Sequence, residues 1–305
     1  MYAFEPEKSL RLVYETFYLA IYSNITIKAT RFYMDLFQAI ILGIIQGLTE
    51  FLPVSSSGHL VIFQNLFGLK EPELFFDISV HIGTLAAIVI FFWKEIRAII
   101  ISLARFIVLA LKKKASFHDV YEDGDAKLAI LIVVGSIPTA IIGILFNKIA
   151  DILFSSVVLV GFMLIITGLL LWGTRWIKKD RKSINDFSVR DALIIGLVQG
   201  MAIIPGISRS GSTIAVGLFL GLNRETAAKY SFLLSIPAIL GASALSLNHL
   251  SAHNVLPLKV TLFGAFTSCI VGYWALKLLV KLVKHGRMQI FAPYCWAIGI
   301  LALIW

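Results

Sequence analysis

The chain has 305 residues, of which 58% are hydrophobic and only 15% are charged, and its mean hydropathy is +0.87. Several apolar stretches approach or exceed the roughly 20 residues with which an α-helix crosses a bilayer, so the composition excludes a soluble globular protein. Backbone exposed to lipid must satisfy its own hydrogen bonds, and long uniform apolar stretches do so as helices. We therefore expect an all-α polytopic membrane protein.

The first 33 residues differ from the rest of the chain. Glu5, Glu7 and Glu15 are scattered through them, and no small-residue cleavage site follows an apolar core, so they do not resemble a signal peptide. Met34 is a possible true start, and an amphipathic surface helix is the alternative for this segment. We expect residues 1–33 to be an extension of unknown role and 34–305 to be the membrane-embedded domain.

Six stretches are predicted to cross the membrane completely. They are residues 78–93, 127–147, 155–177, 226–247, 257–276 and 289–305.

Lys and Arg are distributed unevenly between these stretches. Seven lie in 94–127, six in 175–190 and four in 277–287, whereas the connections at 60–77 and 148–156 carry one each, Lys70 and Lys148. Because basic loops stay in the cytoplasm, this alternation gives the orientation of the chain. It also accounts for the net charge of +9 without a nucleic-acid partner.

A repeat joins the two halves of the chain. A shift of 153 residues aligns "GIIQGLTEFLPVSSSGH" at 43–59 with "GLVQGMAIIPGISRSGS" at 196–212 without a gap. The identical positions of the first copy are Gly43, Gln46, Gly47, Ser55, Ser57 and Gly58. Each copy leads from an apolar helix through a break into a Ser-Gly turn and a second short apolar stretch.

Proline marks the break in each copy. Pro53 and Pro205 each remove a backbone donor and clash with the preceding turn, so each first helix should end there. Non-helical backbone at membrane depth is tolerated only inside protein or beside a wet cavity. We therefore expect two re-entrant helical hairpins, at 36–69 and 190–224; a pair of plain kinked spans is the alternative.

The orientation of the basic loops relates the two hairpins. If 94–127 is cytoplasmic, the first hairpin enters from outside, and the second begins inside at Arg190, which makes the repeat inverted in topology. Inverted repeats commonly place a site near the midplane between broken helices. We expect the tips "EFLPVSSSGHL" at 50–60 and "PGISRSGST" at 205–213 to meet, each at a helix N-terminus that favours an anion.

Arg209 is the most informative residue of the second tip. A guanidinium at membrane depth is costly and marks a functional site, and its fork matches phosphate or carboxylate oxygens. The alternative is a purely structural pair with Glu50. Hydroxyl groups surround Arg209 at Ser208, Ser210, Ser212 and Thr213. Such hydroxyls also serve as helix caps, and Ser212 and Thr213 are open to that interpretation.

Glu50 is the only acid in either tip. A buried carboxylate beside an Arg and an anionic ligand is suited to a divalent cation, Mg²⁺ or Ca²⁺, which takes oxygen ligands and shares them with phosphates. Gln46 lies one helical turn earlier on the same face and is a second donor for the metal or the substrate. A simple counter-ion for Arg209 is the alternative role of Glu50.

His59 follows the serine run and is a candidate general acid or base, since its unperturbed pKa lies nearest neutrality. A helix-to-helix hydrogen bond is the alternative. We expect structural or loop positions for His81, His249 and His253, and packing roles for Cys269 and Cys295. A hydroxyl nucleophile or activated water, a histidine, an arginine and a metal together indicate phosphoryl transfer.

These motifs resemble the undecaprenyl-diphosphate phosphatases associated with bacitracin resistance. The first family motif matches "QGLTEFLPVSSSGHL", the second matches "PGISRSGST", and "SFLLSIPAILGASAL" at 231–245 is also similar. The resemblance covers about 34–305, and the motifs are specific in combination.

The resemblance implies roles for individual residues. Glu50 would be a metal-associated catalytic acid, His59 a catalytic histidine, Ser56 the candidate nucleophile and Arg209 the diphosphate clamp. Substrate binding would fall to Gln46, Ser55, Ser57, Ser208, Ser210 and Thr213. Some members carry a second glutamate where this chain has Gln46, which leaves the metal affinity open.

The resemblance also implies an activity. It is the hydrolysis of undecaprenyl diphosphate to undecaprenyl phosphate and inorganic phosphate, at a site open to the outer face of the bacterial plasma membrane. This reaction recycles the lipid carrier for peptidoglycan synthesis and confers bacitracin resistance. The partners would be the polyprenyl diphosphate and the membrane lipids.

Two other protein classes are alternatives to a diphosphate phosphatase. A lipid-phosphate transporter or flippase without hydrolysis also fits an inverted repeat, although transport alone does not need a Ser-His pair beside the anion clamp. The type 2 phosphatidic acid phosphatases share Ser-Gly-His and Ser-Arg elements. That class places a His six residues after the Arg, where this chain has Ala215, so we disfavour it.

Overall fold

The computed structural model describes residues 34–69, 74–111, 123–147, 153, 156–177, 182–247 and 257–304, and they are helical with no strand among them. This confirms the all-α prediction. The N-terminal extension 1–33, the residues Lys70 and Lys148, and the histidines His249 and His253 lie outside the described residues.

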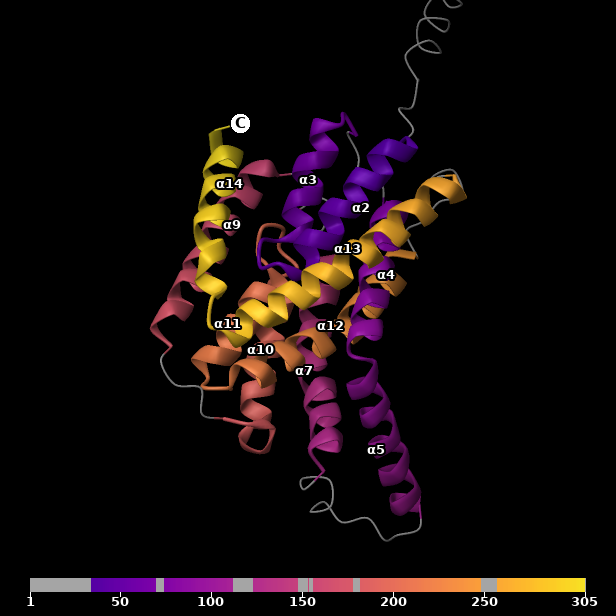
Figure 1. Cartoon of the computed structure of the whole chain (residues 1–305), viewed down its shortest axis with the longest axis vertical. Helices are drawn as coiled ribbons and strands as arrows, with labels where there is room; N and C mark the ends of the chain where they lie inside the picture. The colour runs from indigo at the N-terminus through magenta and orange to yellow at the C-terminus, as the bar shows by residue number, and fades with distance from the viewer. Residues whose placement is uncertain are drawn as a thin grey trace, which may run out of the picture. The chain divides into compact units, whose positions relative to one another are not determined.

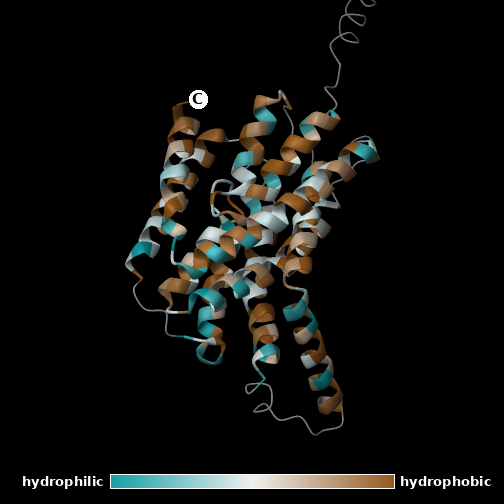
Figure 2. Cartoon of the chain, in the orientation of Figure 1, coloured by the Kyte–Doolittle hydropathy of each residue, from teal (hydrophilic) through white to brown (hydrophobic). Residues whose placement is uncertain are grey.

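Among the described residues, four helices are long and apolar enough to cross a membrane, and they match four of the predicted spans. They are α7 (Gly124–Asn147), α9 (Val157–Gly173, continued by a 3₁₀ turn at Thr174–Trp176), α12 (Arg224–Leu247) and α13 (Leu258–Lys284). Helix α13 runs past the predicted end at 276, because Leu279 and Val283 are buried and continue its core-facing stripe at helical spacing. Figure 2 shows hydrophobic residues along most of these helices.

The other two predicted spans differ from expectation. Helix α4 (Leu74–Phe91) is followed by α5 (Trp93–Leu111) with a bend of 77°, so 94–111 is helix where a loop was expected. The apolar run after Arg97, interrupted only by Ser102 and Arg105, explains this helix. The last span is a 3₁₀ turn (Met288–Phe291) and α14 (Ala292–Ile304), which together are shorter than the other spans. The described part therefore contains four spans, or five if the bent pair is one.

Two pairs of short helices occupy the repeated segments. The first is α2 (Leu36–Phe51) with α3 (Ser56–Leu66), and the second is α10 (Val189–Met201) with α11 (Arg209–Phe219). The breaks at 52–55 and 202–208 contain the predicted prolines. None of these four helices is long enough to span a bilayer by itself.

The long helices pack on these pairs reciprocally (Figure 1). Helix α2 packs on α13 and α10 packs on α7, while α4 lies against α13 and α12 against α7. The two repeats therefore make equivalent contacts: α10 and α12 pack on α7 as α2 and α4 pack on α13. Helices α9 and α14 pack against each other. This equivalence is what two copies related by a two-fold axis would produce.

Equivalent glycines make the closest helix contacts in both copies. A Cβ at Gly43 would lie 2.7 Å from the carbonyl oxygen of Gly264 on α13, and a Cβ at Gly196 would lie 2.0 Å from that of Gly135 on α7. Real Cβ atoms do not approach backbone this closely, so these glycines hold each broken pair against its long helix.

Gly196→Ala should therefore destabilise the protein by about 1–3 kcal/mol, the usual effect of overpacking. Gly241→Ala on α12 is the matched control, since nothing lies within 4 Å of its Cβ. We expect a lower thermal midpoint in detergent for Gly196→Ala only. Equal midpoints for the two variants would refute the proposed role of this contact.

Candidate active site

The tips of the two broken pairs meet. The backbone N–H of Gly206 donates to Ser55 Oγ at 3.1 Å, and Ser210 Oγ donates to the carbonyl of Phe51 at 3.0 Å. A Cβ at Gly58 would lie 3.3 Å from Gly206 Cα, and one at Gly211 would lie 3.0 Å from the Pro53 side chain. The expectation that the tips join is confirmed, and the contacts run both ways across the joint.

The serines of the tips cap the helices that follow them. Ser55 Oγ accepts from the N–H of Gly58 at 3.3 Å, and its repeat equivalent Ser208 accepts from that of Gly211 at 3.1 Å. Each cap hydroxyl also lies close to the hydroxyl of the serine two residues later. The distance is 3.4 Å from Ser55 to Ser57 and 3.3 Å from Ser208 to Ser210. Four of the predicted substrate-binding hydroxyls thus have structural partners.

Ser55 also carries backbone strain. Its φ is 69°, and it is the one non-glycine residue of the described chain with a positive φ. Such a conformation costs about 1–3 kcal/mol and persists where the surroundings enforce it, commonly at functional sites. Ser55 is the N-cap of α3, so this unusual backbone conformation lies directly before Ser56.

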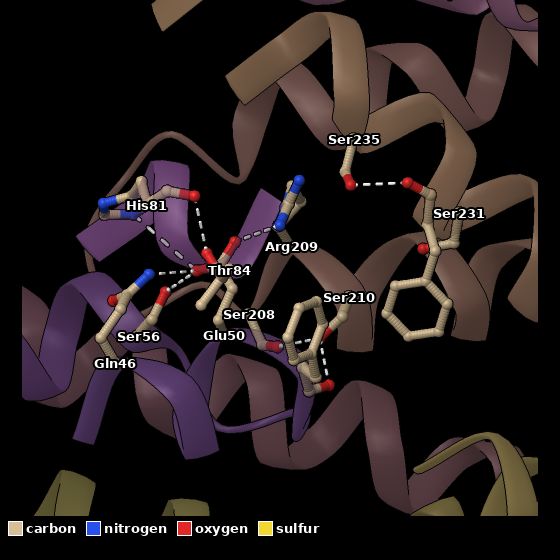
Figure 3. Close-up of polar contacts among 12 residues, drawn as sticks. Gln46, Glu50, Ser56, His81, Thr84, Ser208, Arg209, Ser210, Ser231 and Ser235 are labelled. Carbon is tan, nitrogen blue, oxygen red and sulfur yellow. Dashed lines mark hydrogen bonds and ion pairs between the residues drawn. The ribbon is translucent and has the colours of Figure 1, made fainter. Parts of the chain in front are cut away.

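Glu50 is the centre of the polar cluster (Figure 3). Ser56 Oγ donates to Glu50 Oε2 at 2.6 Å, and Gln46 Nε2 donates to the same oxygen at 3.1 Å. Arg209 Nη2 forms an ion pair with the other oxygen, Oε1, although the two residues are 159 positions apart. Only 4% of the Glu50 side chain and 18% of the Arg209 side chain are exposed. The joint between the tips therefore brings together the candidate nucleophile Ser56, the acid Glu50 and Arg209.

Two buried atoms of this cluster lack a hydrogen-bond partner within the described part of the chain. They are Arg209 Nη1 and Gln46 Oε1. Buried polar atoms are nearly always paired, so an unpaired one points to a ligand. A guanidinium nitrogen calls for an anion, and a carboxamide oxygen calls for a cation or a donor.

The residues present fit a divalent cation. The described residues contain no group of three or more His, Cys, Asp or Glu arranged for a metal. Glu50 nevertheless supplies a carboxylate, and Gln46, whose Nε2 donates to Glu50 Oε2, supplies a buried Oε1 without a partner among the described residues. Hard cations at phosphoryl-transfer sites often take one or two protein oxygens and complete their shell with phosphate and water.

His59 lies beside the joint, and neither of its ring nitrogens is bonded to Glu50. Nδ1 is 2.8 Å from the carbonyl of Ser55, and Nε2 is 2.8 Å from the hydroxyl of Tyr294 on α14. The two rings stack, with centroids 5.7 Å apart. Both nitrogens are therefore occupied by contacts that fix α3 on α14, which is the helix-to-helix bond foreseen as the alternative.

His81 is at the cluster, where the sequence analysis had expected a structural role. Its Nε2 lies 3.8 Å from Glu50 Oε2 (Figure 3). An ionisable side chain inside an apolar span is a functional candidate by default. That signal was present in the sequence and could have identified His81.

Hydroxyls of α11 and α12 support the Arg209 side of the site. Thr213 Oγ1 donates to the carbonyl of Arg209 at 2.7 Å and lies 2.5 Å from Ser231 Oγ. Ser212 donates to the carbonyl of Ser208 at 2.7 Å. Ser231 belongs to the third stretch noted in the sequence, so all three motifs contribute to one region.

Comparison with known proteins gives the family. The model of the family described as bacitracin resistance protein BacA matches residues 39–301. The chain belongs to the BacA family. The matched range includes both tips, His59 and His81.

Several relatives match 87–89% of this chain. The undecaprenyl-diphosphatase of Desulforapulum autotrophicum is 54% identical over 272 residues, which are 89% of this chain and 98% of the relative. That of Desulfatibacillum aliphaticivorans is 50% identical over 89% of this chain and 99% of the relative. That of Desulfosudis oleivorans is 54% identical over 87% and 97%, respectively.

Proposed function

We propose that this chain is an undecaprenyl-diphosphatase, which hydrolyses undecaprenyl diphosphate to undecaprenyl phosphate and inorganic phosphate. The family and the names of its relatives support hydrolysis rather than transport alone. The observation that carries the proposal is the buried Glu50–Arg209 pair with Ser56 on the carboxylate and one guanidinium nitrogen unpaired. The reaction recycles the lipid carrier for peptidoglycan synthesis and confers bacitracin resistance.

Ser56 is the nucleophile in this proposal. Its hydroxyl already donates to Glu50 Oε2 at 2.6 Å, so the carboxylate can take the proton as Ser56 Oγ attacks the terminal phosphorus. The bond between phosphorus and the bridging oxygen breaks, and undecaprenyl phosphate leaves with that oxygen. Water then attacks the phosphoserine, which releases inorganic phosphate and restores the hydroxyl. Direct attack by water is the alternative.

Arg209 would stabilise the charge of the diphosphate, beside the residues that would hold a cation. The unpaired Nη1 of Arg209 would bind a phosphate oxygen while Nη2 stays on Glu50. Glu50 and Gln46 would hold Mg²⁺ or Ca²⁺. When bound, the cation supplies positive charge against the phosphate oxygens. Charge stabilisation is the main requirement of phosphoryl transfer.

The remaining predicted residues support the site. We propose that His59 acts by fixing α3 on Tyr294, and that Ser55, Ser57, Ser208, Ser210 and Thr213 hold the tips in register beside the diphosphate. Their hydrogen bonds support this role. Direct contact of these hydroxyls with the diphosphate stays a prediction.

We place the site near the midplane of a bacterial plasma membrane, open to its outer face. In this arrangement α2–α3 and α10–α11 are re-entrant hairpins of opposite direction. The six full spans are α4–α5 as one broken span, α7, α9, α12, α13 and α14. The short lengths of the paired helices, the reciprocal packing and the basic loops support it. The lipid tail would stay in the bilayer while the diphosphate reaches the tips.

Ser56→Ala tests the proposal. We expect phosphate release from undecaprenyl diphosphate by the purified protein to fall at least about 10³-fold, as when a nucleophile is removed. Ser136→Ala is the control, because that hydroxyl only donates to its own helix at Ile132. A radiolabelled terminal phosphate should appear on the wild type after rapid acid quench.

The outcomes separate the two parts of the proposal. If Ser56→Ala hydrolyses at the wild-type rate, Ser56 is not the nucleophile. If folded wild type releases no phosphate, the assigned activity is wrong.

A further inference from the structure

His81 approaches the cluster from a third element, α4, which belongs to neither tip. Its Nε2 lies 3.8 Å from Glu50 Oε2, the oxygen on which Ser56 and Gln46 also converge. Figure 3 shows its ring beside Glu50 on the side of Gln46. The sequence-based metal site contains only Glu50 and Gln46, so His81 adds a donor of a different type.

The ring of His81 is oriented for ligation. Its Nδ1 lies 2.7 Å from the carbonyl of Asp77, one turn earlier on α4, so the neutral ring carries its proton on Nδ1. Nε2 then presents a lone pair toward Glu50. Histidine ligands of metals characteristically donate their other N–H to a backbone carbonyl or a carboxylate in this way.

The distances suit a shared ion. Two ligands that each lie about 2.1 Å from one cation are separated by roughly 3–4 Å, depending on the angle between them. The separation of 3.8 Å between Nε2 and Oε2 falls within that range. Gln46 Oε1, buried without a partner in the described chain, is available as a third donor.

Access distinguishes His81 from His59. The His81 side chain is 30% exposed, whereas the Glu50 side chain that it faces is 4% exposed, so His81 is on the more accessible side of the cluster. His59 has both ring nitrogens occupied by Ser55 and Tyr294. His81 is therefore the histidine with a nitrogen free to bind at the cluster.

We propose that His81 Nε2, Glu50 and the Gln46 carboxamide oxygen form a mixed nitrogen–oxygen metal site. An imidazole donor favours the first-row transition ions, of which Mn²⁺ is the weakest binder, whereas Mg²⁺ and Ca²⁺ prefer oxygen alone. The site therefore binds Mn²⁺ more tightly than Mg²⁺ or Ca²⁺. The metal at this site would serve the proposed hydrolysis of undecaprenyl diphosphate, and the inference rests on that proposed function.

Pulsed electron paramagnetic resonance of bound Mn²⁺ tests the ligand directly. The full chain in detergent, with Mn²⁺ below one equivalent, should show ¹⁴N modulation from a coordinated imidazole. His81→Ala and His81→Gln should both lose it, and the Kd for Mn²⁺ should rise at least about tenfold. His285→Ala is the control, since this exposed histidine caps α13 and should retain the signal.

The results of this experiment can be distinguished from those of the phosphate-release assay that tests the proposed function. Nitrogen modulation that persists in His81→Gln, or is absent from wild type, overturns the His81 site even if hydrolysis is normal. Modulation that depends on His81 in a wild-type protein without phosphate release supports the metal site and rejects the assigned activity. Thermal midpoints of the variants establish that each is folded.

Discussion

Arg209→Ala should lower kcat/KM for phosphate release about 10³-fold, the scale on which an arginine acts in phosphoryl transfer. The guanidinium holds Glu50 with one nitrogen and has its second buried nitrogen unpaired. The substitution removes both the clamp and the partner of the carboxylate. Arg190→Ala, at an exposed position near the start of α10, is the control and should keep wild-type activity.

Arg209→Lys refines this prediction. Lysine keeps the charge but cannot bind Glu50 and a phosphate oxygen through separate nitrogens of one planar fork. We expect an activity between those of wild type and Arg209→Ala, with most of the loss retained. Full activity in Arg209→Lys would mean that charge alone suffices, and full activity in Arg209→Ala would remove Arg209 from the mechanism.

Glu50→Gln should be as damaging, with phosphate release about 10³-fold lower. The amide cannot accept the Ser56 proton, and it leaves the mostly buried Arg209 without its counter-charge. Because an unpaired buried charge is strongly destabilising, the thermal midpoint should fall as well. Activity is therefore measured well below the midpoint of the variant.

Glu225→Gln provides the comparison for Glu50→Gln. Glu225 pairs with Lys284 at 3.4 Å, but its side chain is 63% exposed, and such surface pairs contribute little. Both activity and midpoint should stay close to wild type. A Glu50→Gln protein that hydrolyses normally would exclude Glu50 as the proton acceptor.

The joint between the tips was predictable because its signals are local and occur twice. The cap serine and the glycine three residues after it recur at the same spacing in both copies, and each break contains a proline, although Pro53 and Pro205 are offset by one position in the alignment. Each of these residues has a backbone reason. The meeting of Glu50 and Arg209 followed from the inversion argument. The long helices also followed from hydropathy, apart from α5 and the true end of α13.

The direction of individual side chains was not predictable. Ser55 starts α3 at a positive φ, which sends Ser56 toward Glu50 and His59 toward Tyr294. No spacing rule gives that choice. His81 reaches the cluster through the packing of α4 beside α2, a contact between helices that only the folded chain reveals.

A double-mutant cycle between Glu50 and Arg209 tests the central claim that the two tips form one hydrolytic site. Phosphate release from undecaprenyl diphosphate is measured for wild type, Glu50→Gln, Arg209→Ala and the double variant. Residues that act as one unit are strongly non-additive, so the double variant should be no slower than the slower single variant. Losses that multiply, to about 10⁶-fold when each single variant loses about 10³-fold, would show that the two residues act independently and would contradict the account.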